Sequence, residues 1–442
     1  MTRPHPTVAV IGAGIAGLAA AHTLRADARV TLFEASDYFG GHAHTVEIEL
    51  PVAAGQPPVR HGVDTGFLVY NDRTYPHLIA LFAELGVETA ASEMSFSVQA
   101  QRSAGQRLEW SGNDLSTVFA QRRNLLDGRF LGMLADLLRF NRLTTRIAEA
   151  GTENELAQPL RDFLDAHRFG TAFREWYFLP MMGCIWSCPT QQMLAFPVAT
   201  MIRFCHNHGL LQIADRPQWR TVRGGSKHYV DKLVAGLDDA RLGTPVRRIT
   251  RTAHGVLIAT DHGTERFDHV VLAAHSDQSL ALLADASPAE QATLGAIRYQ
   301  PNRAVLHTDA SVLPQRHAAW AAWNYEADGA NDSTQVCLHY LLNKLQPLPW
   351  QQPVVVSLNP LRPIARSQVM AEYDYSHPVF DLAALRAQAD VQQLQGRRNT
   401  WFAGAWMGYG FHEDGLKAGL AAAAGLRRRF ASGDDDNAKQ AA

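Results

Sequence analysis

Three glycines near the N-terminus, Gly12, Gly14 and Gly17, have the type and spacing needed to bind a pyrophosphate. They lie between the apolar runs 8–11 and 18–24, an order that predicts a strand, a tight turn and a helix. Gly12 permits the turn, Gly14 leaves the backbone bare for the phosphates, and Gly17 lets the helix pack closely on the sheet. The helix N-terminus then faces the phosphates. The residues between the glycines are expected at the same ligand: Ala13, Ile15 and Ala16.

Glu34 supports a dinucleotide as the ligand of this turn. It lies at the end of the second apolar run, 30–34, about 20 residues after the first glycine, where a carboxylate accepts hydrogen bonds from a ribose. An acidic residue at this position argues against a 2′-phosphate. Because strand, turn, helix and acid are all present, we predict a βαβ dinucleotide-binding unit.

The residues after Glu34 favour FAD. Gly40, Gly41 and His42 continue the motif in a way that resembles E-x5-G-G-R, which is found in the flavoprotein superfamily of flavin amine oxidases, phytoene desaturases and protoporphyrinogen oxidase. The resemblance implies FAD as cofactor, with the second glycine pair against its diphosphate. Here His42 replaces the arginine, so we expect either a weaker anion contact or one made by a protonatable imidazole.

The resemblance covers nearly the whole chain and implies an α/β fold. A Rossmann-like, GR2-type FAD-binding domain is expected over 1–75, 215–290 and 395–430, with an interleaved α+β substrate-binding domain over 76–214 and 291–394. A disordered tail is expected over 431–442. Further cofactor contacts implied by the resemblance are Thr65, Gly66, Phe67, Val246, Ala273, Gly404, Ala405, Phe411 and His412. Trp406 stands where relatives carry a glutamate, which leaves the contact at that point open.

The resemblance also suggests the chemistry. In amine oxidases a lysine reaches the flavin N5 through a water, and the corresponding stretch 299–303 has none. The chain is similar to stand-alone FAD proteins linked with fatty-acid-modifying methyltransferases. We therefore expect an FAD-dependent desaturase or dehydrogenase of an apolar lipid or fatty-acyl substrate, with hydride transfer to flavin N5. The alternatives are a flavin amine oxidase and a noncatalytic, lipid-associated FAD-binding subunit. His412, and less strongly Glu413, are candidate bases; helix capping or phosphate contact is the other interpretation of His412.

Composition sets few further limits. The 442 residues are 46% hydrophobic with a formal net charge of -2, which predicts a large core and gives no sign of a nucleic-acid partner. The first strand begins by Val8, leaving no room for a signal peptide, and we find no apolar run of about 18 residues. These features favour a cytoplasmic protein; they leave the oligomeric state open.

The middle of the chain has three features with two interpretations each. The first is a helical stretch whose arginines suit either a peripheral contact with the inner face of the membrane or a solvated helix face: Arg122, Arg123, Arg129, Arg139, Arg142 and Arg146. The aromatic and methionine-rich segment 174–186 suits a substrate pocket or an ordinary core. Cys184, Cys188 and Cys205, with His206 and His208, suit zinc or buried packing. For the cysteines we favour buried packing, and we predict no metal site.

Overall fold

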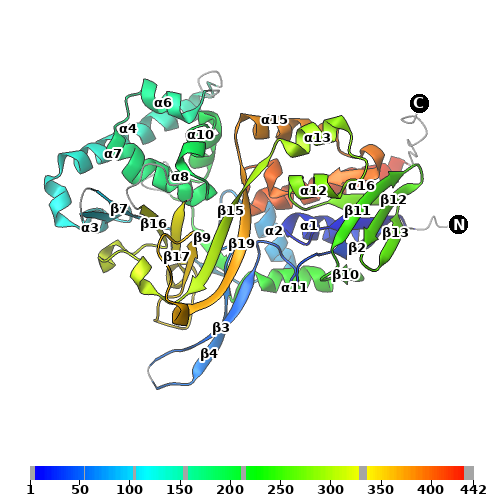
Figure 1. Cartoon of the computed structure of the whole chain (residues 1–442), viewed down its shortest axis with the longest axis horizontal. Helices are drawn as coiled ribbons and strands as arrows, with labels where there is room; N and C mark the ends of the chain where they lie inside the picture. The colour runs from blue at the N-terminus through cyan, green and yellow to red at the C-terminus, as the bar shows by residue number, and fades with distance from the viewer. Residues whose placement is uncertain are drawn as a thin grey trace.

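A computed structural model describes residues 5–53, 55–102, 106–152, 158–210, 216–327 and 336–432. Two parts, each built on its own large sheet, lie side by side (Figure 1). We call them the cofactor half and the substrate half. Of the predicted tail, residues 433–442 lie outside the described residues.

The cofactor half is built on a five-stranded parallel sheet. Its apolar strands are buried on both faces, as is usual for parallel sheets. The strand order is β10 (Asp239–Arg241), β2 (Arg29–Phe33), β1 (Thr7–Ile11), β14 (His269–Leu272) and β20 (Thr400–Phe402). Segments from both ends of the chain therefore lie in one sheet.

Two layers cover this sheet. One core contains residues of α1 (Ile15–Leu24), α2 (Pro76–Leu85), α11 (Lys227–Ala235) and α16 (His412–Ser432). The core on the other face contains residues of β11 (Val246–Thr252), β12 (Gly255–Thr260), β13 (Gly263–Phe267), α13 (Pro288–Gly295) and α15 (Leu382–Asp390). Helix α12 (Ser276–Leu282) packs beside α13.

The predicted domain boundaries need two corrections. Helix α2 buries Leu78, Leu81 and Phe82 in the core of the cofactor half, and α15 buries Ala384 and Ala387 there. Both helices were expected in the substrate half. Helical periodicity shows that a helix buries one face but not which sheet receives it, so these two assignments failed. The last helix also ends later than expected, at Ser432.

The first and last of these helices touch through glycines. A side chain at Gly419 would have its Cβ 2.1 Å from the Ala16 carbonyl oxygen, and one at Gly415 would lie 2.8 Å from Ile15. These glycines let α16 pack with its backbone directly on α1. The contact brings the C-terminal segment to the N-terminal glycine turn.

The substrate half is built on a seven-stranded mixed sheet. Its order is β19 (Val369–Val379), β15 (Arg298–His307), β18 (Val355–Leu358), β17 (Cys337–Leu341), β16 (Trp323–Ala327), β7 (Phe96–Gln101) and β8 (Arg107–Ser111). One face packs on helices, mainly α4 (Gly128–Ala150), α6 (Leu160–Ala166), α8 (Leu179–Trp186) and α10 (Val198–Asn207). Val312, Leu313 and Ile364 help cover the other face.

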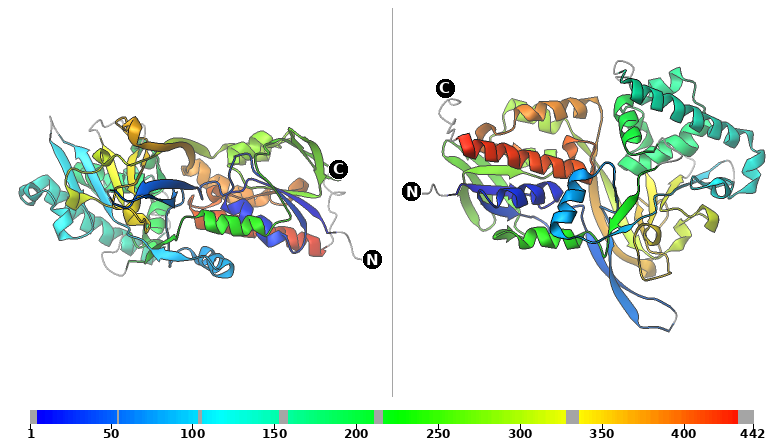
Figure 2. Two further views of the ribbon diagram at one scale, coloured as in Figure 1. Left: turned by 90° about the horizontal axis from the view of Figure 1, so that it is seen from below. Right: turned by 180° about the vertical axis from the view of Figure 1, so that it is seen from behind.

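Short elements complete the molecule. A hairpin forms from β3 (Thr45–Pro51) and β4 (Pro58–Asp64) and projects from the body (Figure 2). A small sheet of β5 (Tyr70–Asn71), β9 (Trp219–Val222) and β6 (Thr89–Ala91) lies where the chain passes between the halves. The shortest helices are α3 (Leu115–Val118), α7 (Thr171–Phe173), α9 (Thr190–Met193) and α14 (Leu342–Leu345).

Within the described ranges, no helix has the length and apolar character needed to cross a bilayer.

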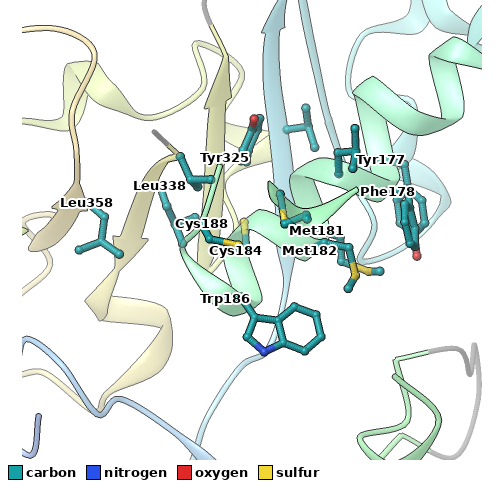
Figure 3. Close-up of a cluster of buried hydrophobic side chains, with 14 of the residues drawn as sticks. Tyr177, Phe178, Met181, Met182, Cys184, Trp186, Cys188, Tyr325, Leu338 and Leu358 are labelled. Atoms are coloured by element: carbon teal, nitrogen blue, oxygen red, sulfur yellow. The ribbon is translucent and has the colours of Figure 1, made fainter. Parts of the chain in front are cut away.

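The aromatic and methionine-rich segment is mostly core. Met181 and Cys184 lie on the side of α8 that faces Tyr325 and Leu338 of the sheet, and Met182 is buried in the same core (Figure 3). The cysteines considered for zinc, Cys184, Cys188 and Cys205, are all buried, and burial raises the pKa of each thiol. Protonated buried thiols behave as small apolar side chains, which is the packing interpretation.

Candidate active site

The glycine turn between β1 and α1 leaves an open surface. Gly12 has a φ of +100°, and a Cβ at Gly17 would lie 1.9 Å from the Gly12 carbonyl oxygen, so both positions require glycine. A Cβ at Gly14 would meet no atom within 4 Å. Gly14 is also the N-cap of α1, and no side chain caps this helix. The helix therefore presents uncapped N–H groups to open space, which suits a diphosphate.

Two other segments meet this turn. Glu34 accepts hydrogen bonds from the backbone N–H of Ala13 (2.8 Å) and of Ser36 (2.9 Å). The Gly40 N–H donates to the Ala13 carbonyl at 2.9 Å, and Gly41 lies against Gly14. The two glycine motifs thus form one surface.

The predicted cofactor contact at Val246 also lies on this side of the site. The Thr244 N–H donates to the Glu34 carbonyl oxygen at 2.7 Å. Val246, two residues later, begins β11. Ala273 lies close to Gly12 and Gly17, because a Cβ at Gly12 would be 3.0 Å from the Ala273 carbonyl oxygen. The structure therefore brings these predicted cofactor residues together.

Asp64 organises the next part of the site and was not among the predicted residues. Its buried carboxylate accepts hydrogen bonds from the Ser226 N–H (2.9 Å), the Thr45 hydroxyl (2.6 Å) and the Gln346 amide (2.8 Å). Burial raises the pKa of Asp64 to about 6. The carboxylate ties the segment of Thr65, Gly66 and Phe67 to the glycine doublet before α11. Its place at the start of an Asp-x-Gly triplet was the available sequence signal.

His42 faces a cluster of histidines. The ring centroid of His42 lies 5.4 Å from that of His377 and 6.4 Å from that of His275. Its Nε2 atom is buried and has no hydrogen-bond partner among the described residues. Burial, reinforced by His377, His275 and His412, holds the pKa of His42 well below its usual value. The imidazole is therefore neutral, which argues against a charged anion contact and leaves a polar atom that a bound group can satisfy.

Strand β19 carries two further site residues that the sequence did not single out. The Tyr375 hydroxyl lies 2.8 Å from the Thr65 hydroxyl. His377, two residues along the same face, has Nδ1 3.0 Å from the Asn302 amide nitrogen, and burial lowers its pKa to about 4. Period-2 alternation of Tyr373, Tyr375 and His377 was the sequence signal. The stretch that lacks the lysine of amine oxidases thus holds an amide–imidazole pair.

The C-terminal segment closes the site. The Ala403 N–H donates to the Leu272 carbonyl at 2.9 Å, which places Gly404 and Ala405 two strands from the glycine turn. Trp406 is buried, and its indole N–H donates to the Ala274 carbonyl at 3.2 Å. Trp406 is therefore a packing residue beneath the ends of these strands.

His412 is fixed by two contacts. Its ring stacks on Phe67 with centroids 3.8 Å apart, and Nε2 lies 2.6 Å from the buried Tyr229 hydroxyl. Burial lowers the pKa of His412 to about 3, so the imidazole is neutral and a weak base. These contacts favour a positioning role over proton abstraction, and the catalytic role of His412 stays a prediction.

Aromatic side chains from the substrate half meet the loop before α16. Phe411 stacks on Phe204 of α10, with centroids 4.7 Å apart. The Trp186 indole N–H donates to the Tyr409 carbonyl at 3.3 Å. We call Trp186, Phe204, Tyr409 and Phe411 the aromatic wall. Trp186 and Phe204 are buried, and Tyr409 and Phe411, which precede α16, are half-buried.

The Glu413 side chain caps the N-terminus of α2. Its two carboxylate oxygens accept hydrogen bonds from the backbone N–H groups of His77 and Leu78, each at 3.0 Å, at the start of α2. The carboxylate is thus committed to capping a helix, and we withdraw Glu413 as a candidate base.

A Glu413→Gln substitution is expected to lower the free energy of unfolding by about 1–2 kcal/mol, because a charged cap on two N–H groups is replaced by a neutral one. Urea denaturation of the FAD-loaded protein measures the loss. The spectrum of bound flavin is expected to stay unchanged. Loss of flavin without loss of stability would show instead that Glu413 acts at the cofactor.

Comparison with known proteins identifies the family. The profile of the family described as flavin containing amine oxidoreductase matches residues 15–317, more than half of the chain. The chain belongs to this family. It is therefore an FAD-dependent oxidoreductase, and the open glycine surface and the unpartnered His42 Nε2 fit FAD. No curated protein sequence matches the chain.

Solved structures share the fold of this flavoprotein. Putrescine oxidase bound to putrescine matches with a TM-score of 0.68 and 17% identity, over 96% of this chain and 99% of that one. A putative protoporphyrinogen oxidase from Exiguobacterium sp. 255-15 matches with a TM-score of 0.66 and 17% identity, over 97% and 100%. A fatty acid isomerase from P. acnes matches with a TM-score of 0.64 and 17% identity, over 96% and 99%. At this identity the matches show the α/β fold and leave the substrate undetermined.

Proposed function

We propose that this flavoprotein dehydrogenates an apolar lipid or fatty-acyl substrate. The aromatic wall is the observation that carries the proposal. Phe204 and Phe411 stack where the substrate half meets the closing segment of the cofactor half; Phe204 is buried, and the half-buried Tyr409 and Phe411 are the members of the wall that a substrate approaching there would contact. Such a wall binds a hydrocarbon chain by removing it from water.

The histidines support an uncharged substrate. The pKa values of His42, His275, His377 and His412 all lie below the usual value because of burial, so these rings carry no charge at neutral pH. Neutral imidazoles offer no counter-ion to an ammonium group. A fatty acid isomerase with this fold is consistent with room for an acyl chain.

The residues have separable roles. FAD, when bound, supplies the two-electron oxidant that takes a hydride from a substrate carbon. The wall orients the chain and excludes water, while Asn302 fixes His377 and Tyr229 fixes His412 through hydrogen bonds. A proton must also leave the adjacent carbon as the double bond forms, and His412 stays the predicted group to accept it.

Anaerobic flavin bleaching tests the proposal. We expect fatty acids or phospholipids to reduce the flavin and to give products lighter by two hydrogens, whereas polyamines leave it oxidised. Phe411→Ser is expected to slow acyl-driven reduction at least about tenfold, since one face of the wall is lost. Phe430→Ser, at the far end of α16, is the matched control. Rapid reduction by polyamines would identify an amine oxidase, and bound FAD that no substrate reduces would indicate a noncatalytic subunit.

A further inference from the structure

Exposed leucines gather at one end of the substrate half. Among the described residues, nine large hydrophobic side chains are exposed, and five of them fall within residues 115–138. Leu126 is 92% exposed and Leu115 is 78% exposed. We call this group the apolar tip; its members are Leu115, Leu125, Leu126, Leu131 and Leu138.

The tip lies on α3, the 3-10 helix Arg122–Leu126 and the first half of α4, at the end of the molecule farthest from the cofactor half (Figure 1). Cβ atoms built at Gly128 and Gly132 would meet no atom within 4 Å. The outward face of α4 therefore has nothing packed on it around these positions. Exposed apolar side chains clustered in this way mark an interaction site more often than leucines scattered singly.

Arginines border the tip. Arg122 and Arg123 are exposed beside Leu125 and Leu126, and Arg142 and Arg146 continue the exposed face of α4 beyond Leu138. Arg122, Arg142 and Arg146 form no ion pair with the described residues. The nearby acids are partly neutralised, because Asp127 pairs with Arg102 and Asp136 with Arg139.

We propose that the apolar tip and these arginines dock the protein on an anionic lipid surface. Leucines would enter the interface between headgroups and acyl chains, while the arginines remain at the level of the phosphates. A lipid surface would remove the exposed leucines from water and would bring anionic phosphates to the unpaired arginines. Another copy of this chain would present the same arginines and repel them. The docking proposal does not depend on the proposed reaction, although docking would bring the enzyme to an acyl substrate.

Vesicle co-sedimentation of the FAD-loaded protein tests docking without turnover. We expect binding to vesicles of phosphatidylglycerol and phosphatidylcholine, weaker binding at high salt, and little binding to phosphatidylcholine alone. The double variant Leu125→Ser/Leu126→Ser is expected to reduce binding at least about tenfold, since two exposed leucines no longer enter the interface. Arg122→Glu/Arg142→Glu is expected to abolish the preference for anionic vesicles.

A matched control is Leu242→Ser/Leu382→Ser, which changes two exposed leucines outside the tip, both in segments of the cofactor half. It is expected to bind vesicles like the unchanged protein. The proposal fails if the unchanged protein ignores anionic vesicles or if the control loses as much binding as the tip variant. It also fails if the tip variant converts a dimer to a monomer in light scattering while vesicle binding is unaffected, because the tip would then join two copies.

Discussion

Replacing Gly14 by valine is expected to give a folded protein that no longer binds FAD. A Cβ at this position meets no protein atom within 4 Å, and the backbone there is extended with φ −68°, so valine fits the protein itself. The added methyl groups instead fill the space in front of the uncapped N-terminus of α1, where the diphosphate belongs. We expect affinity for FAD to fall at least about 100-fold, since lost phosphate contacts and overlap act together.

Flavin absorbance after purification and titration of the apoprotein with FAD measure this effect. Gly132→Val is the matched control, because its Cβ also enters open space but lies on α4, in the other half. Circular dichroism is expected to show the same helix content for both variants. Full FAD affinity in Gly14→Val would contradict the placement of the cofactor at this turn.

The second large effect is expected at a buried ion pair in the substrate half. Glu326 of β16 lies 3.0 Å from Nε2 of the fully buried His339 on β17, and its other oxygen accepts hydrogen bonds from Arg107 and Arg362. Glu326→Leu leaves the imidazolium and Arg107 without their carboxylate. We expect a loss of about 3–5 kcal/mol in the free energy of unfolding, as is typical when one partner of a buried pair is removed.

Urea denaturation of the FAD-loaded protein measures the loss. Glu372→Leu is the matched control: Glu372 pairs with Arg303 across two strands of the same sheet, but both side chains are about half exposed. Such a pair contributes about 0–1 kcal/mol. Adding His339→Leu to Glu326→Leu is expected to restore part of the stability, because no buried charge is then unpaired. Equal losses in the two single variants would contradict the assignment.

The contribution of this pair depends on pH in a defined window. The pKa of His339 rises from 6.5 to about 9 despite burial, because Cys337 and Glu326 favour the imidazolium, so its stabilisation is lost as the pH rises through about 9. The pKa of Glu326 is lowered by His339 and the arginines in spite of burial, so its stabilisation is lost as the pH falls below its ordinary value of 4.5. The stability difference between the unchanged protein and Glu326→Leu is therefore expected to be largest between pH 4.5 and 6.5 and to decline as the pH rises from 6.5 to about 9.

The same residues raise the question of a metal site. The ligand atoms of Glu326, Cys337 and His339 lie within 4.8 Å of one another. Two guanidinium groups already neutralise the carboxylate, however, and a cation there would add positive charge to a buried cluster that is already satisfied. We therefore interpret these residues as an ion-pair network.

Local motifs predicted the strand, turn and helix of the N-terminal glycine segment. The turn of Gly12, Gly14 and Gly17, the acid Glu34 and the second glycine pair are contiguous in sequence, and their conformations follow from glycine and from strand–turn–helix geometry. Such features depend only on residues that are close to one another in the sequence.

Features that depend on long-range pairing were missed. Tyr375 and His377 reach the site because β19 pairs with β15, and no local pattern specifies that partner. The capping role of Glu413 depends on α2 lying more than three hundred residues earlier in the chain. The misplacement of α2 and α15 has the same cause, since an amphipathic helix does not encode the sheet on which it packs.

The interlocking of α1 with α16 has a consequence for biosynthesis. Strand β20 and helix α16 complete the cofactor half, and they leave the ribosome after every other described element. The seven-stranded sheet, in contrast, has all of its strands once residue 379 has emerged. The nascent chain thus carries an unfinished nucleotide cradle until α16 has emerged, and the vitamin-derived coenzyme is captured only after that point.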